Sequence, residues 1–314
     1  MSTSTRSIMW QVNATLLPGI FAYCWWFGWQ LLVPIGCAVL IALLTEALCV
    51  SLRRAPNSMH RLRDSVTDGS SVLTALILVL ALPPGVPLAL IAFAVVVAII
   101  LGKQVYGGLG QNLFNPAMVG YAALLISFPK ALALWPTLDG TTAATALTSL
   151  HNQTGTTIEE LWQSQLGFGT TGGYGFEWIN LAFLSGGLIL LMLRIISWRM
   201  PIAFILTLSL LALAFYDNGS SNSHGSPALA LFSGGTMLAA FYVVTDPVTQ
   251  PIHKQGQWLA GALMGLMVFC IRAFGSFPDG IAFAVLFVNS LTPFINQRLN
   301  QKLLNKKGLG VKAT

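Results

Sequence analysis

The sequence predicts an all-α membrane protein with about ten transmembrane helices. Hydrophobic residues make up 55% of the 314 residues and charged residues only 8%, whereas soluble domains carry about 25% charged residues. Apolar stretches near the length that crosses a bilayer as a helix, roughly 20 residues, recur along the chain. The basic residues stand in short clusters between these stretches. This low charge leaves too little polar surface for a water-facing exterior.

The apolar stretches define the predicted spans. The third is too short to cross a bilayer at about 1.5 Å per residue. We expect it either to be a half-helix that ends at the Leu-Pro-Pro-Gly sequence or to extend into neighbouring polar residues. No small-residue cleavage site follows the first span, so we expect that span to remain in the mature protein. The predicted spans are 8–28, 29–52, 70–83, 85–102, 113–129, 177–197, 200–216, 228–246, 257–275 and 281–298.

The distribution of basic residues predicts the orientation, because cytoplasmic loops are enriched in Lys and Arg. With a cytoplasmic N-terminus and ten alternating spans, every Lys and Arg except Lys130 and Arg272 falls on the cytoplasmic side. A wrong number of spans would scramble this partition. Both termini are therefore predicted to be cytoplasmic.

The longest connection divides the chain into two predicted bundles of five spans, 1–129 and 177–298. An odd number of spans in each half makes any internal repeat an inverted one. The connection itself, 130–176, is predicted to be extracytoplasmic, and loops of this length are usually functional or disordered. Residues 299–314 form a basic cytoplasmic tail.

The residue inventory narrows the chemistry that this chain alone could support. The four cysteines show no CxxC or comparable spacing, so they predict neither an iron–sulfur cluster nor a zinc site. The four histidines all lie in predicted loops, which leaves no pair to ligate a transmembrane haem. Because the basic residues form no patch, we expect no nucleic-acid partner. Among redox cofactors, a flavin needs no metal ligand.

A threonine-rich stretch, LDGTTAATAL at 138–147, lies within the predicted extracytoplasmic loop. The phosphate of a flavin nucleotide is costly to place near a membrane with few basic partners. Esterifying that phosphate to a side-chain hydroxyl would remove one negative charge and anchor the ring. Threonine-rich loops are also common as plain loops, so composition alone leaves both interpretations open.

Residues 139–145, DGTTAAT, resemble the Asp-Gly-x-Ser/Thr-x-Ala-Thr flavinylation motif of the D subunit of Rnf electron-transport complexes. The related B subunit of the sodium-pumping NADH:quinone reductase is similar. The resemblance implies FMN held as a phosphoester on Thr145 and attached by a flavin transferase, with Asp139, Gly140 and Thr142 as the attachment motif. Thr142 replaces a commoner serine, and Ala146 stands where the family often has proline. Further segments that resemble the family are 67–84, 106–129, 233–249 and 271–286.

The resemblance also implies a function. The chain would be a multi-pass subunit of the bacterial inner membrane that relays electrons through covalent FMN. The complex would transfer electrons between NADH and ferredoxin and move Na+ or H+. Its other flavin, iron–sulfur and membrane subunits would be partners, because this chain offers no NADH site. A second, non-covalent flavin, riboflavin, is a further implication.

Three charged residues near the predicted span ends keep two interpretations each. Asp246 either belongs to a helix-terminating Asp-Pro turn or contacts an ion or a second flavin, since carboxylates at a membrane edge are often functional. Arg272 either reaches to the interface or stabilises a reduced flavin. Glu46 is expected to pair with Arg53 or Arg54 of the adjoining loop rather than to act on its own.

Two other function classes compete with electron transfer. Ten spans in two inverted halves with broken helices suit a channel or a secondary transporter for a small solute equally well. A purely structural membrane scaffold is the third class. Only the loop motif separates the electron carrier from these alternatives.

Overall fold

The part of the chain that the structure describes is predominantly helical, which confirms the predicted all-helical class. The computed structural model describes residues 5–53, 58–133, 135–136, 142–143, 145–152, 155, 157–164, 168–221, 223–275, 277 and 279–306.

Helices of the first half follow the first five predicted spans, with a short amphipathic helix, α4, inserted before the third. A two-residue antiparallel ladder closes this half, with Trp135 opposite Ala143. The elements are α1 (Thr5–Thr15), α2 (Leu17–Phe27), η1 (Trp29–Leu31), α3 (Leu32–Leu52), α4 (Ser58–Thr67), α5 (Ser70–Ala81), α6 (Leu88–Ile99), the π-turn η2 (Ile100–Gln104), α7 (Pro116–Ser127), α8 (Pro129–Ala133), β1 (Trp135–Pro136) and β2 (Thr142–Ala143).

Helices of the second half follow the last five predicted spans. The final helix continues beyond the predicted end of the tenth span at 298 and takes in the start of the basic tail. The elements are α9 (Ala146–His151), α10 (Ile158–Ser164), α11 (Phe176–Met192), α12 (Arg199–Ala214), η3 (Asp217–Gly219), α13 (Pro227–Phe232), α14 (Thr236–Leu238), the π-turn η4 (Ala239–Val243), α15 (Lys254–Phe274) and α16 (Ile281–Lys306).

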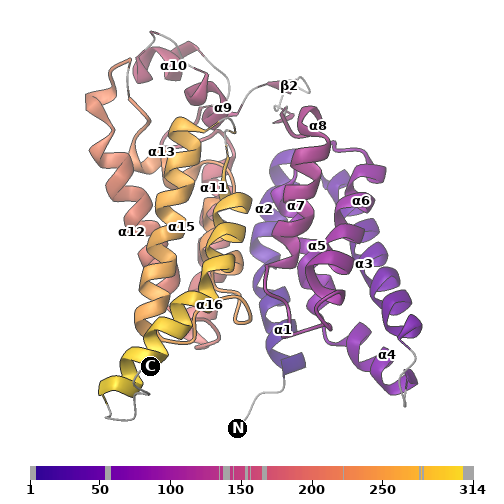
Figure 1. Ribbon diagram of the computed structural model, residues 1–314. Helices are drawn as coiled ribbons and strands as arrows, with labels where there is room; N and C mark the ends of the chain where they lie inside the picture. Colours follow the sequence, from indigo (N-terminus) through magenta and orange to yellow (C-terminus); the bar gives the residue numbers. More distant parts are fainter. Residues whose placement is uncertain are drawn as a thin grey trace.

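The two halves stand side by side as two bundles (Figure 1). Helices α3, α5, α6 and α7 lie in one bundle, and α11, α12, α15 and α16 in the other. Both chain ends lie at the same end of the molecule, together with α4. The segments α8, α9, α10 and β2 lie at the opposite end. The region that holds the threonine-rich stretch is therefore at the far end from the termini.

The outward faces of the long helices are apolar. On α3, Leu40, Leu44 and Leu48 follow one another at four-residue spacing and are 58–60% exposed. Water would penalise such a continuous apolar stripe, whereas lipid accommodates it. In the described part of the chain two helical segments, Trp29–Leu52 and Lys254–Phe274, are long and apolar enough to cross a membrane by themselves, and shorter apolar helices accompany them. The helical fold is thus that of a membrane protein.

The third and the eighth predicted spans do not form full-length helices. The third span is a half-helix, as one of the two alternatives predicted: α5 has 12 residues, about 18 Å, and ends directly before the Leu-Pro-Pro-Gly sequence. The eighth span was predicted as one helix over 228–246, and this was wrong. It breaks at Ser233, Gly234 and Gly235 between α13 and α14. The backbone at Gly234 has φ +58°, a left-handed conformation that glycine adopts without steric cost.

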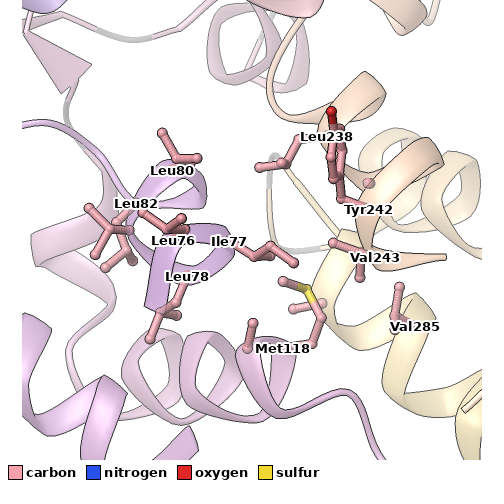
Figure 2. Packing of buried hydrophobic residues seen from close by; sticks show 14 of the residues in the cluster. Leu76, Ile77, Leu78, Leu80, Leu82, Met118, Leu238, Tyr242, Val243 and Val285 are labelled. Atoms are coloured by element: carbon pink, nitrogen blue, oxygen red, sulfur yellow. The ribbon is translucent and has the colours of Figure 1, made fainter. Parts of the chain in front are cut away.

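The core lies where the half-helix α5 meets the interrupted span of the other bundle. Figure 2 shows Ile77 of α5 and Met118 of α7 on one side and Val243 and Val285 on the other. All four side chains are at most 3% exposed. The two bundles therefore share one apolar core, which holds the broken helices of the two halves against each other.

A buried ion pair secures the beginning of α5. Lys103 Nζ lies 2.9 Å from Glu46 Oε1, and the two residues are 2% and 0% exposed. The same ammonium group donates to the hydroxyls of Ser70 (2.7 Å) and Ser71 (3.1 Å) in the first turn of α5. The expected pairing of Glu46 with Arg53 is therefore wrong. Arg53 instead donates to the backbone carbonyls of residues 104 and 107, and Arg54 lies outside the described residues.

Removing one partner of this pair should destabilise the protein, because the other charge would remain buried and uncompensated. We expect Glu46→Gln to cost about 3–5 kcal/mol. The double variant Glu46→Gln with Lys103→Met should lose less than Glu46→Gln alone, since no unpaired charge remains. Thermal unfolding of the detergent-solubilised protein measures both effects. A double variant that loses the sum of the two single losses would show that the two side chains do not interact.

Candidate cofactor site

Thr145 begins the short helix α9 at the end of the molecule away from the termini. Its backbone is extended, with φ −68° and ψ 163°, and its Oγ1 accepts a hydrogen bond from the backbone N–H of Thr148 at 3.2 Å. Threonine is a favoured residue at this N-cap position because its side-chain oxygen satisfies one of the unpaired N–H groups of the first turn. The hydroxyl also lies 3.0 Å from Thr148 Oγ1. The helix start thus fixes where this hydroxyl points.

Thr145 lines a cavity of about 340 Å³, here called the central cavity. It lies between the two bundles, because α2, α5 and α7 of the first half and α11, α14, η4 and α16 of the second half contribute to its wall. Its volume falls in the range of ligand sites, about 300–1,000 Å³. Its lining includes Tyr23, Tyr121, Trp135, Thr145, Leu147, Thr148, His151, Phe176, Phe183, Gly234, Gly235, Phe277 and Asp279.

Aromatic side chains form much of this wall. The rings of Trp135 and Phe176 pack edge to face with centroids 5.1 Å apart, and Phe27 packs behind both at 5.8 Å and 6.1 Å. Aromatic faces and edges of this kind favour stacking with another planar ring. Trp135 is brought here by the β1–β2 ladder, which also sets the chain direction just before Thr145. The cavity can therefore hold a planar aromatic ligand.

A second cavity of about 400 Å³, here called the lateral cavity, adjoins the first. It lies among α9, α12, α13 and α15, and it is lined by Leu147, Leu150, His151, Leu208, Ala212, Ser221, Ser223, His224, Leu229, Ala230, Phe269, Arg272 and Ala273. Leu147 and His151 line both cavities. Helix α9 is accordingly the wall between them.

Arg272 ties the break in the eighth span to the neighbouring helices. Its guanidinium donates to the carbonyl of Ala230 (3.0 Å), to Thr236 Oγ1 (3.1 Å) and to Asp279 Oδ1 (3.2 Å). Only 8% of the arginine side chain is exposed. The guanidinium thereby satisfies a backbone carbonyl before the break at 233–235 and a side-chain hydroxyl after it. Arg272 thus does not line the central cavity itself, but it holds the residues on either side of the break, whose glycines do.

The predicted site residues are not all brought together. Asp139 and Gly140 lie outside the described residues, and Thr142 lies in β2 opposite Pro136. Asp246 follows η4 at the other end of the bundle, where it accepts hydrogen bonds from Asn115 Nδ2 and Thr249 Oγ1, both at 3.3 Å.

Sequence reasoning missed two kinds of site residue. The first is the aromatic wall, because Trp135 and Phe176 are 41 positions apart and nothing local marks them as partners. The second is His151, which the sequence shows as one of four loop histidines. Its position six residues after Thr145 was the available signal, since a short helix starting at the threonine would carry both side chains.

The fold and the cavity together define a helical membrane protein with a cofactor-sized, aromatic-walled site at one end of its bundle. Among the described residues, no three His, Cys, Asp or Glu side chains are grouped so that they could hold a metal ion. Thr145 is one of the hydroxyl-bearing residues that line this site.

The chain belongs to the NQR2, RnfD, RnfE family, whose model matches residues 1–305. Similar proteins carry the name of the D subunit of the ion-translocating oxidoreductase complex. That of Pseudomonas paraeruginosa (strain DSM 24068 / PA7) is 41% identical over 93% of this chain and 89% of its own length. Those of Cellvibrio japonicus (strain Ueda107) and Escherichia fergusonii are 39% and 38% identical, each over 93% of this chain and over 88% and 92% of their own lengths.

His224, one of the two histidines that line the lateral cavity, should make stability depend on pH. His224 packs against the rings of Phe274 (5.0 Å between centroids) and Phe215 (6.0 Å), and burial lowers the pKa of its imidazole. The unfolded chain therefore binds more protons than the native protein as the pH falls below about 6.5, and stability is lost in that direction. We expect His224→Phe to lose less unfolding temperature than the parent between pH 7.5 and pH 5.5. An equal acid loss in the variant would contradict this assignment.

Proposed function

We propose that the protein is the D subunit of an Rnf-type ion-translocating oxidoreductase and carries FMN covalently on Thr145. The family match and the names of the similar proteins support the oxidoreductase role over a separate channel, transporter or scaffold. The observation that carries the cofactor assignment is geometric: Thr145, at the N-cap of α9, lines the aromatic central cavity.

The residues of the site fit a flavin nucleotide. Attachment would form an ester bond between Thr145 Oγ1 and the phosphorus of the flavin nucleotide while one P–O bond to a leaving group breaks. The hydroxyl proton would go to that leaving group, so the net change is the addition of FMN less one water. The product is a phosphodiester with one negative charge, which is cheaper to hold beside an apolar wall than a free phosphate dianion. A flavin transferase performs this step, and the attachment motif 139–145 precedes the helix that fixes the acceptor.

The cofactor supplies the electron-accepting ring, and the chain supplies its surroundings. Trp135 and Phe176 would flank the ring, while Phe183 and Phe277 complete an apolar lining that limits access of water. Such a lining is how a protein tunes a cofactor without metal ligands. Because the central cavity touches both bundles, a flavin there would be held by both halves of the fold.

The membrane orientation is part of the proposal. Both termini would be cytoplasmic and 130–176 extracytoplasmic, in a bacterial inner membrane. The common position of the two chain ends, opposite α8, α9 and α10, supports this arrangement (Figure 1). A contact that occurs in both halves supports an inverted relation between them. Lys103 at the end of the fourth span contacts the first turn of α5, and Arg272 at the end of the ninth contacts Thr236 of α14.

The complete reaction would be distributed over several subunits. The flavin of this chain would pass electrons between other subunits, which supply the NADH and iron–sulfur sites, and the transfer would be coupled to movement of Na+ or H+. A second, non-covalent riboflavin belongs to the same proposal. The role assigned to the residues of this chain is to hold the covalent flavin at the extracytoplasmic end.

Replacing Thr145 by asparagine separates attachment from folding. Asparagine caps a helix about as well as threonine but offers no hydroxyl to phosphorylate. We expect the parent to show flavin fluorescence in a denaturing gel and Thr145→Asn to show none, with unchanged expression and unfolding temperature.

Thr148→Val is the matched control, because Thr148 lines the same cavity and contacts the Thr145 hydroxyl without being the proposed acceptor. This variant should keep its fluorescence. A fluorescent Thr145→Asn band would refute the attachment site, and a dark parent from cells that contain the flavin transferase would refute the covalent cofactor.

A further inference from the structure

His151 is the last residue of the helix that Thr145 begins, and its side chain lines both the central and the lateral cavity. The imidazole is held in place from one side. Its Nδ1 lies 3.0 Å from the backbone carbonyl oxygen of Arg272. That carbonyl belongs to the last turn of α15, where carbonyl groups lack the usual partner inside the helix. The imidazole thus satisfies a carbonyl group in the last turn of α15, and this hydrogen bond fixes the orientation of the ring.

This hydrogen bond determines which ring nitrogen is available. A carbonyl oxygen only accepts, so Nδ1 must carry the hydrogen. The other nitrogen, Nε2, has no hydrogen-bond partner among the described residues. In the neutral ring Nε2 is an acceptor, and after protonation it becomes a second N–H donor with a positive charge. Among the described residues, Nε2 is therefore the ring nitrogen that remains available to a ligand.

The other ionisable groups around the described part of the central cavity are Tyr23, Tyr121 and Asp279. The Asp279 carboxylate already pairs with Arg272, and the Tyr23 hydroxyl donates to the carbonyl of Leu82 at 2.6 Å. Arg272 is itself occupied by protein acceptors, and it lines the lateral cavity. His151 is consequently the side chain in this wall that can bring a positive charge to a ligand without breaking an ion pair.

The length of α9 decides which part of a ligand His151 can meet. Six positions separate it from Thr145, roughly 9 Å along a helix. A phosphoryl group bonded to Thr145 Oγ1 would therefore lie at the opposite end of α9 from His151. The part of a threonine-linked flavin within reach of Nε2 is its ring.

We infer that His151 is a positioning residue for the flavin ring, and that its Nε2 supports the negative charge that the ring gains on reduction. The inference rests on the proposed function. Charge placed near the ring nitrogens is a general means by which proteins set the potential of a bound flavin. Arg272, which the sequence suggested for this task, contributes through its backbone carbonyl, which orients the imidazole.

The test compares His151→Gln with His224→Gln in the purified complex. Glutamine at 151 can still donate to the Arg272 carbonyl but cannot take up a proton. For His151→Gln we expect unchanged gel fluorescence and a lower flavin midpoint potential. The equilibrium constant for reduction of the flavin should fall at least tenfold. For a two-electron couple this is about 30 mV. His224→Gln alters only the lateral cavity and should leave the potential unchanged. His151→Lys restores a positive charge and should recover part of the shift.

The possible outcomes distinguish a failure of the proposed function from a failure of the inference about His151. A parent that carries no covalent flavin refutes the proposed function and the inference with it. A normally flavinylated His151→Gln with an unchanged potential overturns the inference alone. An equal shift in His224→Gln also overturns it, because the effect would then be general to this end of the fold. If His151→Gln does not fold, His151→Asn takes its place in the same comparison.

Discussion

Polar groups inside a membrane must find hydrogen-bond partners within the protein, and this constraint governs the half-helix α5 and the interrupted eighth span. One buried cation lies at the start of α5 and another at the break between α13 and α14. Lys103 donates to Ser70 and Ser71 at the start of α5. Arg272 donates to Ala230 and Thr236 on either side of the break. Acidic partners, Glu46 and Asp279, offset the two buried charges.

The break in the eighth span makes room for the site. With the helix interrupted at 233–235, Gly234 and Gly235 line the central cavity with backbone instead of side chains. The short helix α9 then covers the opening and brings both Thr145 and His151 to the wall. The carbonyl of Arg272 fixes the imidazole of His151, while its guanidinium holds the break. One residue thereby connects the integrity of the fold to the geometry of the site.

Much of this architecture was predictable from the sequence, because hydropathy and proline reflect local requirements. Helices lie at all ten apolar stretches, and the Leu-Pro-Pro-Gly sequence indicated the half-helix α5. The break in the eighth span was missed, since three small residues barely lower the mean hydropathy. The Glu46–Lys103 pair was missed because its members are 57 positions apart, and the nearer arginines were the obvious candidates. The motif indicated Thr145 as a candidate, whereas the residues around it come from several distant segments that only the fold assembles.

The central claim is that a threonine hydroxyl at one end of a helical membrane bundle bears the electron carrier. Mass spectrometry of the proteolytic peptide that contains Thr145, taken from the native complex, tests it most directly. We expect this peptide to be heavier by one FMN less one water, with the added mass localised to Thr145. An unmodified peptide, or a flavin localised to another residue, would contradict the claim.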